Sequence, residues 1–158
     1  MTPASAERDH DATASRSMQL RLDPIAVRAD AAEAAAFRRA TLDAAEACDA
    51  DELPFTFPVR WLARSEIRAA VARLLNEQDS AALLPLHESQ SFDYAAPLRA
   101  DVDYRMRVHM RRESEAAQLV LSAEIGPDEG IVHLRMEMVL RLFAGRESSL
   151  ESQTGREP

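Results

Sequence analysis

The strongest constraint in this sequence is an alternation of apolar and polar residues that recurs three times after residue 101. The apolar positions of the three runs are Val102, Tyr104, Met106, Val108 and Met110; Leu119, Leu121, Ala123 and Ile125; and Val132, Leu134, Met136, Met138, Leu140 and Leu142. A period of two is typical of strands with one buried and one wet face. The segment Gly126-Pro127-Asp128-Glu129-Gly130 predicts a hairpin turn between the last two runs, since both glycines can adopt positive φ. We therefore predict an antiparallel meander whose apolar face needs a cover.

The longest candidate for that cover is a helix predicted after Asp30. Asp30 and Glu33 have the spacing of a capping box, and a helical face of small residues follows: Ala32, Ala36, Phe37, Ala40 and Ala44. Small side chains let a helix approach a sheet closely, so we predict that the sheet wraps around this alanine-rich helix. The alternative is that it is an alanine-rich surface helix.

A second amphipathic helix is predicted to begin at Ser65, with apolar residues at helical spacing: Ile67, Ala70, Val71, Leu74 and Leu75. A short strand, with Met18, Leu20 and Leu22 alternating, is predicted before Pro24.

Composition narrows the class of protein. A chain of 158 residues predicts one domain, and its net charge of −8 argues against a nucleic-acid binder. The lone Cys48 excludes an internal disulfide and suits a reducing cytoplasm, and no apolar run is long enough for a membrane span. We expect a polar, disordered leader over 1–17, a folded domain over 18–144 and a flexible tail over 145–158. No metal-ligand spacing and no cofactor motif is present in the sequence.

Two separated motifs extend the argument. The segment Leu86-His87-Glu88-Ser89-Gln90-Ser91-Phe92-Asp93-Tyr94, followed by Pro97-Leu98-Arg99-Ala100-Asp101, resembles the strand and turn of the amino-terminal domain of MaoC-like dehydratases. The segment Phe55-Thr56-Phe57-Pro58 resembles the Pro-Pro-Thr-Phe-Pro segment of the same family. The resemblance implies an α+β hot-dog fold, in which an antiparallel sheet wraps a central helix. One departure is that Ala100 runs directly into Asp101 where the family has a turn glycine.

The same resemblance implies binding of acyl thioesters carried on coenzyme A or acyl carrier protein. Active members of the family hydrate an enoyl thioester, or dehydrate a 3-hydroxyacyl thioester, with an Asp-x-Asn-Pro-Ile/Leu-His loop. Asp43 falls at the aspartate position of that loop, but Cys48 falls at the histidine position. A thiol is a poor water-activating base near neutral pH. We therefore predict no catalytic residue, with Asp43 a helix-end or surface carboxylate and Cys48 an inert thiol rather than a nucleophile.

By the same resemblance, Phe57, Phe92, Tyr94 and His87 are the candidate acyl-binding residues, although a hydrogen-bonded structural role is the preferred interpretation of His87. His109 and His133 are interpreted as sheet-face residues. The only basic cluster is Arg105, Arg107, Arg111 and Arg112. We interpret it as a solvated sheet face, with phosphate contact or carrier-protein docking as the alternative.

Three functions remain open at this point. The first is a non-catalytic hot-dog subunit that dimerises with an active hot-dog chain to form a hydratase or dehydratase. The second is a stand-alone homodimer that binds acyl-coenzyme A or acyl carrier protein without turnover. The third is a hot-dog thioesterase in which Asp43 or Glu46 activates water.

Overall fold

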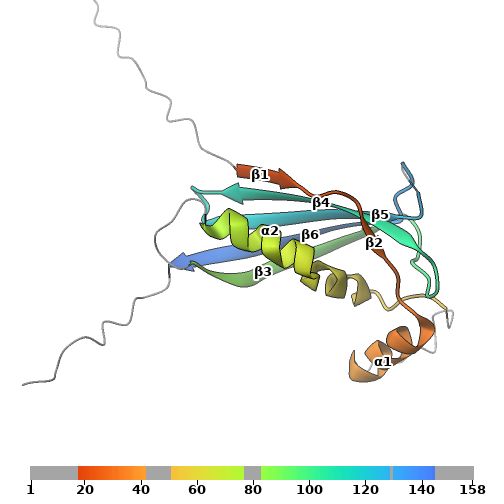
Figure 1. Cartoon of the computed structure of the whole chain (residues 1–158). Coiled ribbons are helices and arrows are strands. Elements are labelled where there is room, and N and C mark those ends of the chain that lie inside the picture. The colour runs from red at the N-terminus through yellow and green to blue at the C-terminus, as the bar shows by residue number, and fades with distance from the viewer. Residues whose placement is uncertain (1–17, 42–50, 77–82, 129, 145–158) are drawn as a thin grey trace, which may run out of the picture.

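An antiparallel sheet with a helix lying across one face is the core of the molecule (Figure 1). The computed structural model describes residues 18–41, 51–76, 83–128 and 130–144. Its elements are β1 (Met18–Arg21), β2 (Ile25–Val27), α1 (Ala31–Thr41), the 3-10 helix η2 (Phe57–Ala63), α2 (Ser65–Asn76), β3 (Leu83–Tyr94), β4 (Tyr104–Glu113), β5 (Gln118–Gly126) and β6 (Leu134–Ala144). The strand order is β1-β4-β5-β6-β3, and β2 also pairs with β4. The long strand β3 therefore forms one edge of the sheet, and the short strands β1 and β2 form the other.

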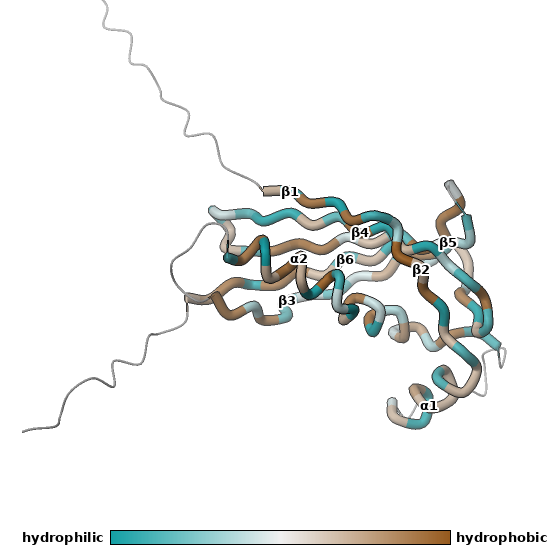
Figure 2. The backbone as a smooth tube through the Cα atoms, viewed as in Figure 1, coloured by the Kyte–Doolittle hydropathy of each residue, from teal (hydrophilic) through white to brown (hydrophobic). Residues whose placement is uncertain are grey.

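The predicted alternation is confirmed in the meander. The buried members of the alternating series are Tyr104, Met106, Val108, Met110, Leu119, Leu121, Ala123, Ile125, Leu134, Met136 and Leu142. Hydrophobic and hydrophilic positions both occur along the strands of the sheet (Figure 2). Cross-strand pairs share a face, and Met106 is paired with Ile125, which in turn is paired with Leu134. These pairs make one continuous apolar face.

The two glycines of the predicted turn have different roles. Gly130 adopts a φ of 85°, as a tight turn requires. Gly126 does not have positive φ, so that part of the prediction is wrong. A Cβ atom on Gly126 would lie 1.7 Å from the carbonyl oxygen of Ile131, so close backbone approach requires glycine at the end of β5.

The helix that covers the sheet is α2, and the prediction that the alanine-rich helix takes this place is wrong. Ile67, Ala70 and Leu74 of α2 are buried in the same core cluster as the strand residues. In α1 the only buried residue is Ala34, and the helix lies beyond the end of the sheet (Figure 1). The physical reason is volume, because Ile and Leu side chains fill the layer above a sheet and alanines leave it empty.

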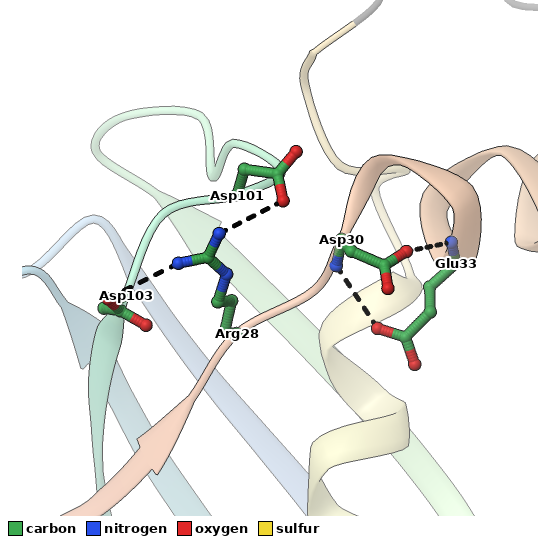
Figure 3. Close-up of polar contacts among 5 residues, drawn as sticks. All are labelled: Arg28, Asp30, Glu33, Asp101 and Asp103. Atoms are coloured by element: carbon green, nitrogen blue, oxygen red, sulfur yellow. Dashed lines mark hydrogen bonds and ion pairs between the residues drawn. The ribbon is translucent and has the colours of Figure 1, made fainter.

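Both helices begin at the predicted residues. The Asp30–Glu33 capping box is confirmed, because the Glu33 backbone N–H donates to Asp30 Oδ1 at 2.7 Å and the Asp30 N–H donates to Glu33 Oε2 at 3.3 Å (Figure 3).

At the far end of α2, the buried Arg112 donates through Nη1 to the carbonyl oxygen of Leu74 at 3.1 Å. A cation that binds the last carbonyls of a helix stabilises its negative end. Arg112 thus fastens α2 to β4.

No helix among the described residues is long and apolar enough to cross a membrane.

Candidate functional site

Three aromatic rings gather where β3 ends. Phe92 and Tyr94 lie on β3 with stacked rings whose centroids are 6.4 Å apart. The ring of Phe55, from the segment before η2, lies 4.9 Å from Phe92 and 5.2 Å from Tyr94. Phe55 is 60% exposed, although each ring contact removes some apolar surface from water. We call Phe55, Phe92 and Tyr94 the aromatic cluster.

A hydrogen bond fixes the cluster. The Tyr94 hydroxyl donates to the carbonyl oxygen of Phe55 at 2.7 Å, which ties the segment before η2 to β3. Burial raises the pKa of Tyr94 to about 12, because the anion is poorly solvated there. The hydroxyl therefore remains protonated near neutral pH and acts as a donor rather than a base.

A hollow of about 430 Å³ opens beside the cluster. Its lining residues are Glu52, Leu53, Phe55, Tyr94, Ala95, Ala96, Pro97 and Leu98. Most of these side chains are apolar, and Glu52 supplies a carboxylate at the wall. A small apolar concavity with few polar groups is the usual form of a small-molecule site. We call it the aromatic groove.

Backbone hydrogen bonds hold the two walls of the groove together. The Leu53 N–H donates to the Leu98 carbonyl at 2.7 Å, and the Ala100 N–H donates to the Asp51 carbonyl at 2.7 Å. Arg99 reinforces the junction through ion pairs with Asp51 and, at 3.9 Å, with Glu52. The turn after β3 thereby positions the segment that carries Phe55.

That turn lacks the glycine expected from the family resemblance, and the structure shows what replaces it. Asp101 adopts a φ of 60°, the left-handed conformation that glycine adopts at little cost and aspartate tolerates better than most residues. Arg28 holds the turn, with Nη2 3.2 Å from Asp101 and Nη1 3.6 Å from Asp103 (Figure 3). The Asp101 N–H also donates to the Ala29 carbonyl at 2.8 Å. The turn is closed by bonds to the segment before α1.

The structure places the four predicted acyl-binding residues in three different surroundings. Phe92 and Tyr94 lie in the aromatic cluster. Phe57 is only 2% exposed and packs in the core, with its ring centroid 5.3 Å from that of Phe37 and 5.9 Å from that of Trp61. His87 is exposed on β3. Asp43 and Cys48 lie outside the described residues.

A β-bulge decides which way His87 faces. The pairing of β3 with β6 shifts between His87 and Ser89, so no residue of β6 lies directly opposite Glu88 in the strand register. His87 is opposite Leu140 and Phe92 is opposite Met136, and both partners belong to the core-facing series. His87 and Phe92 consequently share the helix side of β3. Without the bulge, their spacing of five residues would place them on opposite faces.

Two residues near the site were not identified from the sequence. Phe55 lines the groove where Phe57 was expected, and nothing in the sequence tells which of these two phenylalanines faces the core. Gln90 lies between His87 and Phe92 on the helix side, and its Oε1 and Nε2 are buried without a hydrogen-bond partner among the described residues. Buried polar groups are normally paired, so an unpaired amide marks an unusual position. No sequence signal distinguishes it from the other polar residues of β3.

The predicted arginine cluster is divided between the two faces of the sheet. On the outer face, Arg107 lies 3.4 Å from Glu124 and Arg111 lies 3.2 Å from Glu113. Arg105 is exposed. Arg112 points inward and bonds α2, so including it in a solvated face is wrong for this residue. The remaining three are consistent with a wet outer face.

No group of three or more His, Cys, Asp or Glu side chains that could hold a metal ion occurs among the described residues. His109 lies on the outer face, opposite Ser122. The ring of His133 contacts that of Tyr104 edge to face, with centroids 5.9 Å apart.

No family model and no curated protein matches the sequence. Comparison with solved structures does give matches. The C-terminally truncated 3R-hydroxyacyl-ACP dehydratase complex HadBC of Mycobacterium tuberculosis matches with a TM-score of 0.55 at 17% identity, over 81% of this chain and 98% of that one.

Two further structures match over a similar length. A hot-dog-like protein of Thermanaerovibrio acidaminovorans gives a TM-score of 0.53 at 12% identity, over 80% of this chain and 82% of that one. A probable thioesterase of Bartonella henselae gives 0.51 at 12% identity, over 77% and 91%. At such low identities the likeness concerns the fold alone. Together with the antiparallel sheet and the helix across its face, it confirms the predicted α+β class: the chain has the hot-dog fold.

Proposed function

We propose that this chain is an acyl-thioester-binding hot-dog subunit, the non-catalytic partner of an enoyl-thioester hydratase or 3-hydroxyacyl-thioester dehydratase. The observation that carries the proposal is the aromatic groove, which opens at the end of β3, a strand that pairs on one side only among the described strands. A site at such an edge can be completed by a second hot-dog chain. The groove would supply apolar wall, and the second chain would supply the acid–base residues.

The chemistry of the groove suits an acyl tail. Its walls are the side chains of Leu53, Phe55, Tyr94 and Pro97, and the hollow of about 430 Å³ has room for a short apolar chain. Each methylene taken from water into such a wall contributes ~0.8 kcal/mol. A tail of four carbons would gain about 3 kcal/mol, so contacts to the carrier would have to supply the rest of the affinity.

The edge strand suits a partner chain. β3 is 12 residues long and pairs with β6 on one side only among the described strands. Beside this edge, Leu84 is 56% exposed, Leu86 47% and Phe143 47%. A long apolar edge strand is prone to pair with another chain unless something covers it. The Mycobacterium tuberculosis neighbour is itself described as a complex, which supports pairing here by analogy of fold.

The absence of catalysis rests on two arguments. In the sequence, Cys48 stands where the family resemblance places histidine. At the aromatic groove, the Tyr94 hydroxyl is committed to the Phe55 carbonyl, and its raised pKa makes it unsuited to activate water.

The test is to assay hydration of crotonyl-coenzyme A by the purified chain, by a hot-dog chain that carries Asp-x-Asn-Pro-x-His, and by their mixture. We expect turnover that requires the catalytic chain and rises at least about tenfold when this chain is added. Phe55→Ala should reduce that gain by raising KM, because it removes an apolar wall of the groove while leaving the catalytic residues of the second chain intact. The conservative control is Phe55→Leu. Strong activity of this chain alone, abolished in Asp43→Asn, would overturn the proposal.

A thioesterase is the second candidate, and the observation that favours it is Glu52. Its carboxylate lines the aromatic groove, where it could activate water at a thioester carbonyl. Release of free thiol from acyl-coenzyme A by this chain alone, lost in Glu52→Gln and kept in Asp43→Asn, would establish it. If the chain dimerises with itself and binds acyl-coenzyme A without thiol release or hydration, the stand-alone binding protein is correct.

A further inference from the structure

The outer face of the sheet, away from α2, carries a second hollow that the acyl-binding role does not use. The N-terminal strands leave β4 near Pro24: β1 is paired as far as Arg21 with His109, and β2 resumes with Ile25 opposite Met106. Between them, the Leu22 N–H makes a single bond to the Val108 carbonyl at 3.1 Å. Pro24 has no backbone N–H to donate to the strand ladder, so the sequence itself accounts for the interruption between β1 and β2.

Two adjoining hollows of about 440 Å³ each lie at this interruption, and they share Pro24 and Arg107. One is lined by Arg21, Leu22, Pro24, Arg107, Val108, His109, Ser122 and Glu124. The other is lined by Pro24, Arg105, Arg107 and Asp128. We call the two together the outer groove.

Register explains why polar groups converge in the outer groove. Arg21 is opposite His109, and His109 is opposite Ser122, so the three side chains form one row across β1, β4 and β5. Arg107 and Glu124 form the neighbouring row. A guanidinium, an imidazole and a hydroxyl therefore project from the same small area of the sheet.

The carboxylates that line the outer groove do not neutralise the positive charge of its arginines. Glu124 is shared between two guanidiniums, with Arg107 at 3.4 Å and Arg135 at 3.2 Å. Arg21 and Arg105 are exposed and form no ion pair with a described residue. The lining thus holds three arginines against Glu124 and Asp128, although the whole chain has a net charge of −8.

His109 provides a second, independent observation. Its Nε2 atom is buried and has no hydrogen-bond partner among the described residues. Leaving a buried polar atom unpaired costs ~1–3 kcal/mol. Because Nε2 is not exposed to solvent, a ligand would reach it only after a side-chain movement, and that contact would offset the cost.

We infer that the outer groove binds a small molecule through one or two phosphate groups. Planar guanidinium forks match phosphate oxygens, and a neighbouring hydroxyl adds a further hydrogen bond. The concave form and the overall negative charge of the chain favour a small ligand over a nucleic acid. This inference goes beyond the acyl-binding proposal and is independent of it, because the outer groove and the aromatic cluster use opposite faces of the sheet.

The experiment is isothermal titration calorimetry, in which the full chain is titrated separately with inorganic pyrophosphate, ADP and adenosine. We expect saturable 1:1 binding of pyrophosphate and ADP at one competitive site, weakened by added salt, and no binding of adenosine. Equal affinity for pyrophosphate and ADP would identify a site for phosphate groups alone, while tighter binding of ADP would extend it to nucleotides. No saturable binding of either phosphate compound would overturn the inference.

Three variants sharpen the result. Arg21→Gln and Arg105→Gln should each weaken binding about tenfold, because each removes one charge-assisted contact. Arg68→Gln is the matched control: it is an exposed arginine on α2 and should leave binding unchanged. Equal weakening by all three variants would indicate nonspecific attraction and overturn the site. Melting temperatures would show that all variants are folded.

Discussion

The two edges of the sheet are built in opposite ways. The β3 edge is one strand of 12 residues, beside which Leu84, Leu86 and Phe143 are exposed. The other edge consists of β1, with four residues, and β2, with three, separated at Pro24. Short strands and the break at Pro24 limit further pairing at that edge, whereas β3 is long enough to pair with another chain, although it contains Pro85 and a bulge. The comparison indicates that a partner chain would pair at β3, and that the edge near Pro24 is closed to strands but open to a small anion.

The largest effect is expected on association with a partner chain, when charged residues are introduced into the β3 edge. In the double variant Leu84→Lys and Leu86→Lys, lysines replace exposed leucines beside the edge that would face the second hot-dog chain, so the dissociation constant of the complex should rise at least about tenfold. The matched control at the opposite edge is Gln19→Lys on the exposed side of β1, which should leave the complex intact. Analytical ultracentrifugation measures both. Equal dissociation of the two variants would show that the edges do not differ.

A smaller effect, on the free energy of unfolding, is expected from a substitution of Tyr94 at the end of β3. Tyr94→Phe removes the hydrogen bond to the Phe55 carbonyl and should lower the free energy of unfolding by ~1 kcal/mol at pH 8. The pKa of Tyr94 is raised to about 12 from 10.0, so its stabilising contribution is fully present below pH 10 and is lost as the pH rises from 10 through 12. Urea unfolding at pH 8, 10 and 11 should therefore show the difference between the two proteins shrinking. A constant difference would mean that Tyr94 ionises equally in the folded and unfolded chains.

The smallest effect is expected at the bulge in β3. The pKa of Glu88 is lowered from 4.5, chiefly by the hydrogen bond from Arg141 and then by that from Gln118. Arg141 Nη2 lies 2.6 Å from Glu88 Oε1. A lowered pKa gives stability that is present above pH 4.5 and is lost as the pH falls through the folded-state pKa.

Glu88→Gln should accordingly melt slightly below the parent protein at pH 7 and level with it in stronger acid. Glu113→Gln at the end of β4, where the partner is Arg111, is the control for an ion pair without a bulge. If the pH profile of Glu88→Gln runs parallel to that of the parent, the Glu88–Arg141 pair does not stabilise the bulge.

Much of the fold was predictable because its signals are local. The period of two identified the meander, and the Asp30–Glu33 pair marked the start of α1. The apolar spacing after Ser65 identified α2 with nearly correct bounds. Each of these signals depends on neighbours within a few residues.

The candidate site was less predictable because it depends on contacts between distant segments. Phe92 and Tyr94 were identified, but Phe55 reaches them only because the turn 97–101 bonds to residues 51–53. Phe57, two residues away, packs against Phe37 in the core instead.

Residue spacing was enough to predict β1, the three strands of the meander and both helix starts, because backbone geometry converts spacing directly into faces. The family resemblance indicated β3 and the hot-dog class, and β2 was not predicted. Only the tertiary structure decided that α2 covers the sheet, because the two helices competed for one layer and the larger side chains filled it. It alone decided that the bulge at Glu88 brings His87 to the side of Phe92, and that Arg112 points inward to the end of α2. The face to which a strand residue points, and the side to which an arginine extends, depend on the neighbouring strand or helix. Strand pairing and helix packing set these neighbours, and the local residue pattern does not.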